Sequence, residues 1–273
     1  MEKIQRTFNR LRAAKKTALI PFFTGGYPSL SLTGPLLLAL QDAGADAIEV
    51  GIPFSDPLAD GPVIQAASSK ALAKQATPKK ILKAVASVRN QLRVPVVCLT
   101  YWNPVIQFAK GGDSASVKAF IQAAHESGFS GVIVPDVPVE EGALLREQAQ
   151  KERFAAVFLA APTSPAERLR AIVKASTGFI YYVSVTGTTG VRRQLPVELS
   201  QGIRQLKLLT TKPVCVGFGI STPAQARAVA RVADGVIVGS ALVRTMAQAK
   251  NQNEAIRKAA SFTRQLNQAV KSG

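Results

Sequence analysis

Histidine and cysteine are scarce in this chain of 273 residues, and their scarcity excludes several kinds of active site. His125 is the only histidine, so a metal site with several histidine ligands is excluded, and its place near the end of a predicted helix favours a surface residue over a catalytic one. The two cysteines, Cys98 and Cys215, lie in separate predicted strands and form no C-x-x-C pair. We therefore expect no metal site and no disulfide, and buried thiols of this kind indicate a reducing, cytoplasmic location.

Long apolar runs and acidic residues are also few. No apolar run approaches the ~20 residues needed to span a bilayer, so we expect no membrane partner. Lys and Arg number 34 against 17 Asp and Glu, a net charge of +17 that raises nucleic acid as a partner. The basic residues are scattered over many predicted helices, however, without interleaved aromatics or a nucleic-acid motif. We expect no nucleic-acid partner, and a surface charge that favours solubility and attracts small anions.

Short apolar strands alternate with amphipathic segments of helix length from Ala18 onward, which predicts a parallel sheet. Eight such units favour an α/β fold of the closed (β/α)8 TIM-barrel type over an open doubly wound sheet, because the turn after the first strand, F-T-G-G-Y-P, is not G-x-G-x-x-G. The predicted strands are Leu19–Phe23, Ala47–Val50, Val96–Thr100, Gly131–Val134, Ala155–Leu159, Ile180–Val183, Pro213–Val216 and Gly235–Val238.

One domain covering residues 1–273 is expected, since this length is normal for a single barrel. The first sixteen residues place three apolar side chains on one helical face among basic ones. This segment is either a transit peptide or, as we prefer, a helix that caps one end of the barrel. The other predicted helices, which include an extra one after the second strand, are Ser29–Ala43, Val63–Ala73, Pro78–Leu92, Ser114–Ser127, Val139–Glu152, Pro165–Ala175, Val197–Leu209, Pro223–Val232 and Glu254–Val270.

Two carboxylates near the second strand suggest acid and base chemistry, because barrels of this type place their chemistry on the loops after the strands. Glu49 interrupts an apolar strand and shares a face with Ala47, so we expect it to point into the barrel mouth, where desolvation raises its pKa toward neutrality. The alternative is a buried ion pair. Asp60 lies in a Gly- and Pro-rich loop that we expect to be open to water, leaving it ionised to accept a hydrogen bond from the substrate. The alternative is an aspartate that forms the turn before Gly61.

Glycine-rich turns follow the seventh and eighth strands, at Gly217–Gly219 and at Gly239–Ser240. Either turn alone is explained by a tight bend, but together they favour a phosphate site built from backbone N–H groups and a helix amino end. A third glycine-rich stretch, Gly187–Gly190, is either a mobile lid or a solvent loop.

The motif F-S-D-P-L-A-D-G-P-V-I-Q at 54–65, preceded by Glu49, resembles the signature of the tryptophan synthase alpha chain family. Further matches follow in the family's order: P-D-V-P-V-E-E at 135–141, G-T-T-G-V-R at 187–192, G-F-G-I-S at 217–221 and G-S-A-L-V at 239–243. The resemblance implies a lyase of tryptophan biosynthesis that cleaves indole-3-glycerol phosphate, by a retro-aldol reaction, to indole and glyceraldehyde 3-phosphate.

The resemblance also implies roles for individual residues. Glu49 would protonate the indole ring carbon and remove the glycerol hydroxyl proton, and Asp60 would stabilise charge that develops at the indole nitrogen. Tyr181 would be the active-site tyrosine, with the neighbouring Tyr182 as the alternative. The implied substrate-binding residues are Phe22, Leu99 and Tyr101 around the indole, Gly190, Gly219, Gly239 and Ser240 at the phosphate, and Thr189 in a lid that closes toward Asp60.

By the same resemblance, Pro53, Asp56 and Asn103 would face a tryptophan synthase beta chain in an alpha2beta2 heterotetramer. This chain would need no cofactor of its own, whereas the beta chain would use pyridoxal phosphate. Two alternatives stay open: a stand-alone lyase of the same fold that releases free indole, and a non-catalytic basic barrel that binds phosphorylated ligands or nucleic acid.

Overall fold

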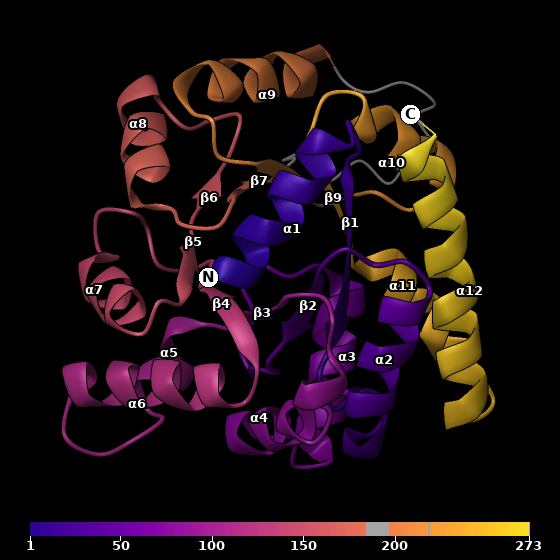
Figure 1. Cartoon of the computed structure of the whole chain (residues 1–273). Coiled ribbons are helices and arrows are strands. Elements are labelled where there is room, and N and C mark those ends of the chain that lie inside the picture. The colour runs from indigo at the N-terminus through magenta and orange to yellow at the C-terminus, as the bar shows by residue number, and fades with distance from the viewer. Residues whose placement is uncertain (184–196, 218, 273) are drawn as a thin grey trace.

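The strands of the protein form a nearly closed barrel surrounded by helices (Figure 1). The structure, a computed structural model, describes residues 1–183, 197–217 and 219–272. Within them, nine parallel strands form one sheet in the order β5-β4-β3-β2-β1-β9-β8-β7-β6. Their bounds are β1 Ala18–Thr24, β2 Ile48–Gly51, β3 Val96–Leu99, β4 Phe129–Ile133, β5 Ala155–Val157, β6 Leu159–Ala160, β7 Ile180–Val183, β8 Val214–Gly217 and β9 Gly235–Val238.

The eight strands predicted from the sequence are present, and the fifth is split by Phe158 into β5 and β6. The split has a local cause, because the Phe158 N–H donates to Ser176 Oγ at 3.3 Å, where an unbroken strand would use a backbone carbonyl. Since β5 and β6 are the two ends of the sheet order but consecutive in the chain, the sheet closes on itself at this residue. The TIM-barrel prediction is thus confirmed.

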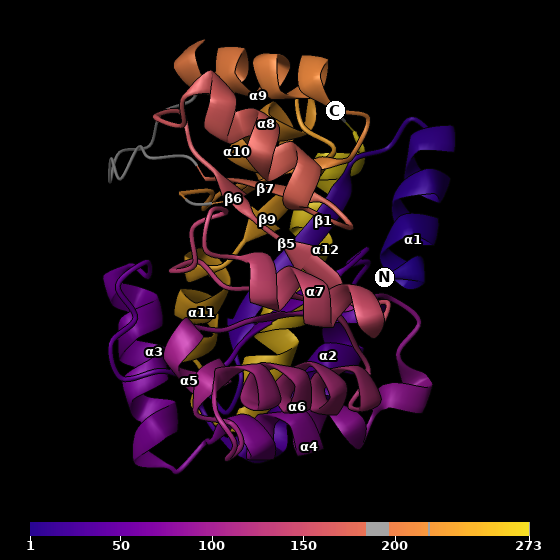
Figure 2. The same cartoon turned by 90° about the vertical axis from the view of Figure 1, so that its left-hand side faces the viewer.

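The helices of the described residues cover the outside and both ends of the barrel (Figures 1 and 2). Their bounds are α1 Glu2–Ala13, α2 Thr33–Asp42, α3 Pro62–Ala73, α4 Pro78–Ala86, α5 Trp102–Ile106, α6 Asp113–Glu126, α7 Ala143–Lys151, α8 Ala166–Ala175, α9 Val197–Leu209, α10 Pro223–Ala230, α11 Ser240–Ala247 and α12 Gln252–Lys271, with short 3₁₀ turns at Leu30–Leu32 and Arg89–Gln91.

Three predicted helices are shorter by five or more residues in the structure. The helix expected at Ser29–Ala43 is a 3₁₀ turn followed by α2, and the one expected at Pro78–Leu92 ends at Ala86, where the Ser87 hydroxyl turns back to donate to the Ala84 carbonyl. The helix expected from Val139 starts at Ala143 because the preceding segment forms turns. Helices α5 and α11 were not among the predicted helices, because they are too short for a clear helical period.

The amino-terminal helix α1 caps the end of the barrel where the strands begin, as predicted. Its apolar side chains Ile4, Phe8 and Leu11 are buried, and the Phe8 ring lies 6.0 Å from that of Phe179, the residue before β7. Figure 2 shows α1 on one side of the strands and α3, α5 and α11 on the other. The loops that follow the strands are therefore at the end opposite α1.

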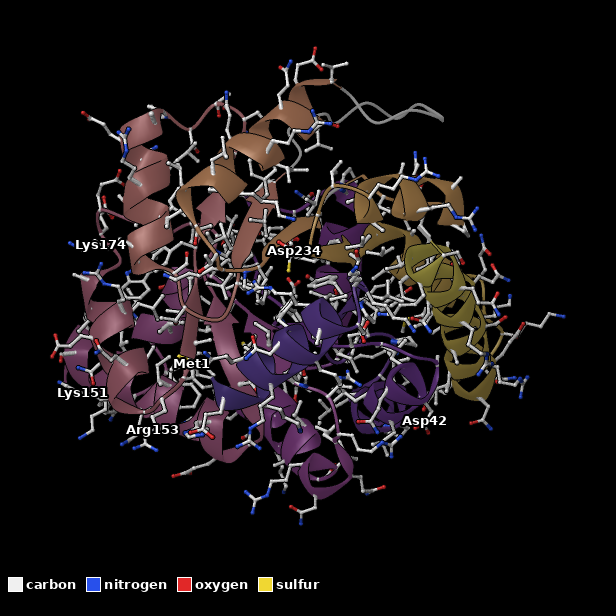
Figure 3. The ribbon with its side chains drawn as sticks, turned by 45° about the horizontal axis from the view of Figure 1, so that its top comes forward. Met1, Asp42, Lys151, Arg153, Lys174 and Asp234 are labelled. Carbon is white, nitrogen blue, oxygen red and sulfur yellow. The ribbon has the colours of Figure 1, made fainter. Side chains whose placement is uncertain are left out.

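The outer helices carry most of the charge. Lys151 on α7 and Lys174 on α8, for example, project away from the barrel (Figure 3). No helix among residues 1–183, 197–217 and 219–272 is both long and apolar enough to cross a membrane.

The strand register determines which side chains meet inside the barrel mouth. Phe22 on β1 pairs with Glu49 on β2, and Glu49 pairs with Val97 on β3. Residues in register on parallel strands project to the same face, so Phe22, Glu49 and Val97 lie together, and all three are buried. The mouth at this level is apolar apart from one carboxyl group.

Candidate active site

Glu49 is enclosed in the apolar mouth of the barrel. Only 1% of the residue is exposed, and neither carboxylate oxygen has a hydrogen-bond partner among the described residues. Burial, and then the nearby charge of Asp60, raise the pKa of Glu49 to about 8. No ion pair of Glu49 occurs in the described part of the chain, so the geometry favours a neutral carboxylic acid at pH 7 over a buried salt bridge.

Asp60 lies on the loop between β2 and α3 and is half-buried. Burial raises the pKa of Asp60 to about 6, against a lowering by a hydrogen bond from the Tyr101 hydroxyl. The loop is thus less open to water than its Gly- and Pro-rich composition suggests. At pH 7 the site combines a mostly protonated Glu49 with a mostly ionised Asp60, which is the division of protonation states that acid and base chemistry requires.

Tyr181 and Tyr182 lie on opposite faces of β7. Tyr181 is buried, and after burial itself the charges of Glu49 and Asp60 further raise its pKa, which places it near both carboxylates. The Tyr181 hydroxyl occupies space beside Gly217 that any side chain there would fill. Tyr182 instead points outward, its hydroxyl against Gly202 of α9. Of the two tyrosines, the geometry brings Tyr181 to the carboxylates.

Phe22 and Leu99 form apolar walls close to Glu49. Phe22 is 6% exposed and its ring packs against Gly51 and Gly239. Leu99, 8% exposed, is the register partner of Gly51 on β3. Tyr101, two residues after Leu99, is also buried. These side chains present a flat, apolar surface beside the carboxyl group, suited to an aromatic ring.

Backbone N–H groups are available where the predicted phosphate would lie. Gly239 and Ser240 join β9 directly to α11, and the first backbone hydrogen bond of this helix runs from the Val243 N–H to the Gly239 carbonyl at 3.1 Å. The N–H groups of the first turn before Val243 therefore have no helical acceptor, and they lie at the positive end of the helix. Gly219 is exposed and has φ +79°, a left-handed conformation that glycine adopts without strain.

Part of the predicted site lies outside the described residues, namely Thr189, Gly190 and the whole candidate lid at Gly187–Gly190. Their expected roles stay predictions.

The residues predicted to face a partner differ in exposure. Asp56 is exposed and accepts a hydrogen bond from the Ser55 hydroxyl at 2.6 Å, and Asn103 is exposed on α5. Pro53, in contrast, is buried, so it has little surface left for a direct contact. Leu58, on the same loop as Asp56, is 89% exposed and was not predicted from the sequence to face a partner.

Asp136, which follows β4, is a further residue without a predicted role. Both of its carboxylate oxygens accept from the Trp102 N–H, at 3.0 and 3.1 Å, so it holds the amino end of α5. A carboxylate placed directly after a barrel strand, in P-D-V-P, is the signal that could have identified it.

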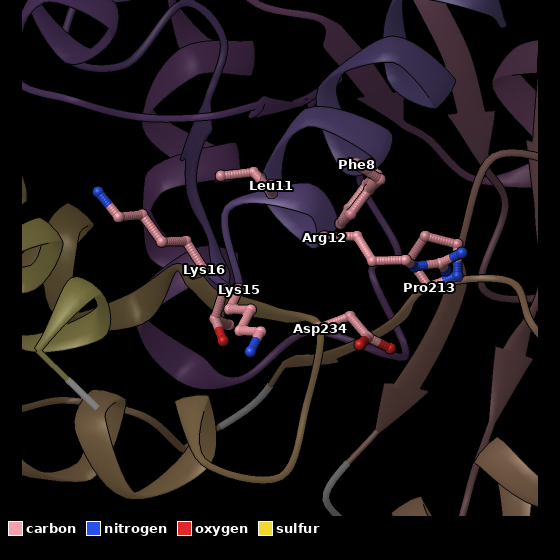
Figure 4. A pocket seen from close by; sticks show the side chains of 8 residues that line it. Phe8, Leu11, Arg12, Lys15, Lys16, Pro213 and Asp234 are labelled. Atoms are coloured by element: carbon pink, nitrogen blue, oxygen red, sulfur yellow. The ribbon is translucent and has the colours of Figure 1, made fainter.

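A separate cavity of about 180 Å³ lies at the other end of the barrel, under α1 (Figure 4). It contains none of the predicted site residues. Its lining residues are Phe8, Leu11, Arg12, Lys15, Lys16, Thr17, Pro213 and Asp234. Within the described ranges, no group of three or more His, Cys, Asp or Glu side chains is arranged to hold a metal ion.

The fold and the site together define a class of protein: a (β/α)8-barrel enzyme with two carboxyl groups and a tyrosine gathered at one mouth of the barrel. The comparisons with known proteins narrow this class. A sequence model of the family described as tryptophan synthase alpha chain matches residues 8–271, so the chain belongs to the tryptophan synthase alpha chain family.

Individual relatives agree with this assignment over almost their full length. The chain is 47% identical to the tryptophan synthase alpha chain of Gloeobacter violaceus, over 98% of this chain and 94% of the relative. It is 42% identical to that of Arabidopsis thaliana, over 98% of this chain and 96% of the relative. The crystal structure of tryptophan synthase subunit alpha from Legionella pneumophila superposes with a TM-score of 0.90 at 35% identity, covering 99% of both chains.

Proposed function

We propose that Glu49, Asp60 and Tyr181 carry out the reaction of this family in the mouth of the barrel. As a tryptophan synthase alpha chain, the protein is a lyase of tryptophan biosynthesis that cleaves indole-3-glycerol phosphate to indole and glyceraldehyde 3-phosphate. The observation that carries the assignment of residues is the pairing of a buried carboxyl group, with a pKa of about 8, and a second one with a pKa of about 6.

The protonation states allow each proton transfer of the retro-aldol cleavage. Neutral Glu49 donates its proton to the indole ring carbon that bears the glycerol chain, and the ring nitrogen becomes positively charged. Ionised Asp60 accepts a hydrogen bond from the indole N–H and stabilises this charge. The Glu49 carboxylate then removes the proton of the glycerol hydroxyl next to the ring, the carbon–carbon bond breaks, and its electron pair returns to the ring. An aldehyde and indole result, and Glu49 is protonated again.

The remaining site residues bind and orient the substrate. Phe22, Leu99 and Tyr101 hold the indole ring beside Glu49, an assignment supported by their burial and by the register of β1, β2 and β3. The phosphate binds to the N–H groups of Gly219, Gly239 and Ser240 with Gly190, and Thr189 belongs to a lid that closes toward Asp60. The free N–H groups at the start of α11 support the phosphate assignment.

The chain acts with a tryptophan synthase beta chain. Asp56 and Asn103 contact the partner, and Pro53 shapes the loop from within. The exposure of Asp56 and Asn103, and that of Leu58 on the same loop as Asp56, supports the assignment of this surface to the partner. We place the protein in the cytoplasm, as one domain of residues 1–273 in an alpha2beta2 heterotetramer, without a cofactor of its own and with pyridoxal phosphate in the beta chain.

The experiment is to measure indole released from indole-3-glycerol phosphate by the wild type and by Glu49→Gln, each with and without a beta chain. The wild type should be slow alone and accelerate with the partner, and Glu49→Gln should lose more than ~100-fold in kcat under both conditions, because glutamine cannot donate or accept the proton. Glu126→Gln, an exposed site on α6, is the matched control and should keep full activity.

The pH dependence gives a second readout. Activity should rise as Asp60 ionises near pH 6 and fall as Glu49 ionises near pH 8. Equal turnover of Glu49→Gln and wild type would overturn the proposal. Fast turnover without the beta chain would identify a stand-alone lyase instead.

A further inference from the structure

We infer that Tyr101 is a positioning residue for the reaction: its hydroxyl holds the end of the β2–α3 loop and aims the Asp60 carboxylate at the substrate. This inference rests on the proposed function and adds to it, because lining the indole pocket requires only the Tyr101 ring.

The Tyr101 side chain contacts both ends of the loop that carries Asp60. Its ring stacks on Phe54 at the start of the loop, with centroids 5.4 Å apart and an interplanar angle of 30°. Its hydroxyl oxygen accepts the Ala59 N–H at 3.1 Å, immediately before Asp60. Tyr101 is 2% exposed, so its side of these contacts is buried. The loop is therefore attached to one side chain in the loop after the neighbouring strand, β3.

The backbone under Tyr101 is also fixed. Tyr101 is the residue before the first turn of α5, and the next N–H, that of Trp102, donates to both oxygens of Asp136. Asp136 belongs to the loop after β4, so hydrogen bonds connect the loops after β4, β3 and β2 in succession. Asp60, the residue after Ala59, lies at the end of this series.

The Tyr101 hydroxyl can still donate its hydrogen to Asp60. A tyrosine hydroxyl has one hydrogen to donate, and since its oxygen accepts from Ala59, that hydrogen is free for the Asp60 carboxylate. The hydrogen bond from Tyr101 lowers the pKa of Asp60 while burial raises it. A carboxylate has about four acceptor positions, so Asp60 can accept from Tyr101 and from an indole N–H together.

Other titratable groups near Asp60 also bear on its pKa. Among the described residues, Glu49 on β2 and Tyr181 on β7 interact with Asp60. A carboxylate at Glu49 would repel the Asp60 charge, so Glu49 does not lower the pKa of Asp60. The hydrogen bond from Tyr101 opposes the effect of burial and favours the ionised form of Asp60.

The test is Tyr101→Phe, which keeps the ring and its stacking and removes only the hydroxyl. Without the hydrogen bond, the pKa of Asp60 should rise, so the acid limb of the kcat/KM profile should move up by about one pH unit, a loss of roughly fivefold at pH 6. The alkaline limb, which belongs to Glu49, should stay near pH 8. An NMR titration of the Asp60 carboxyl carbon should show the same upward shift without substrate.

Three further proteins separate this role from a merely structural one. Tyr182→Phe removes a buried hydroxyl that has no described hydrogen-bond partner and should leave the profile unchanged. In an Asp60→Asn background, Tyr101→Phe should have almost no further effect on kcat, because Tyr101 acts through Asp60. Difluorotyrosine at position 101, a stronger donor of the same shape, should move the acid limb to lower pH and serves if Tyr101→Phe fails to fold.

A profile of Tyr101→Phe that superposes on the wild type, or additive losses in the Asp60→Asn background, would overturn the inference. If instead the wild-type protein released no indole, the proposed function itself would fail, so the two failures are distinguishable.

Discussion

Glu49→Gln should make the protein more stable while abolishing its activity, and the gain should grow with pH. The reason is the burial of a carboxyl group whose two oxygens have no described hydrogen-bond partner. In the unfolded chain this group ionises with a pKa near 4.5, whereas in the folded protein its pKa is about 8. Between these values the folded state binds a proton that the unfolded state has lost, so the free energy of unfolding falls as the pH rises.

The expected magnitude follows from the two pKa values. Each pH unit between 4.5 and about 8 costs the wild type about 1.4 kcal/mol of stability, which reaches about 3 kcal/mol at pH 7 and levels off at about 5 kcal/mol above pH 8. Glutamine does not ionise, so Glu49→Gln lacks this cost. Asp60, with a raised pKa of its own, adds a smaller dependence of the same sign that is present in both proteins and largely cancels in the difference.

The assay is urea unfolding of both proteins at intervals from pH 4.5 to 9, followed by circular dichroism. At pH 4.5 the difference in unfolding free energy reflects only the exchange of an acid for an amide, and its increase from there to pH 8 measures the buried carboxylate. Glu126→Gln, on an exposed position of α6, is the matched control for the exchange of an acid for an amide. A constant difference for Glu49→Gln across this range would refute the reasoning, since it would mean that Glu49 ionises as freely in the barrel as in water.

Three substitutions test the positions of the two tyrosines on β7. Gly217→Ala would put a Cβ 2.6 Å from Tyr181 Cζ, so it should lower kcat by displacing that ring and destabilise the fold by about 1–3 kcal/mol. Gly202→Ala would put a Cβ 2.9 Å from Tyr182 Cζ and should destabilise the fold similarly in urea unfolding while leaving kcat unchanged, so a loss of kcat here would contradict the outward placement of Tyr182. Tyr182→Phe should change the free energy of unfolding by no more than about 1 kcal/mol, because the deleted hydroxyl has no described hydrogen-bond partner; a larger loss would show that the hydroxyl is bonded.

Loop contacts could be anticipated only in part from the sequence. The Gly- and Pro-rich composition of residues 51–62 correctly predicted a loop. It also predicted that the loop is open to water at Asp60, which is instead half-buried. Composition does not show which side chain covers the loop. In the structure Tyr101, from the loop after β3, covers this loop through the stack on Phe54 and the hydrogen bond from the Ala59 N–H. Such contacts join residues more than forty positions apart, and no local pattern encodes them.

The sequence by itself determined the barrel and the chemistry that it carries. Eight apolar segments separated by helices require a parallel sheet, and a carboxylate inside one of those segments, followed by the motif at 54–65, indicates both the acid and the family. Only the tertiary structure decided which of Tyr181 and Tyr182 faces the carboxylates and how far the pKa of Glu49 rises. The physical reason is that a parallel barrel strand is buried on both faces, so alternation shows which residues share a face but not which face is the interior. Desolvation, likewise, depends on the atoms that other strands bring around a group.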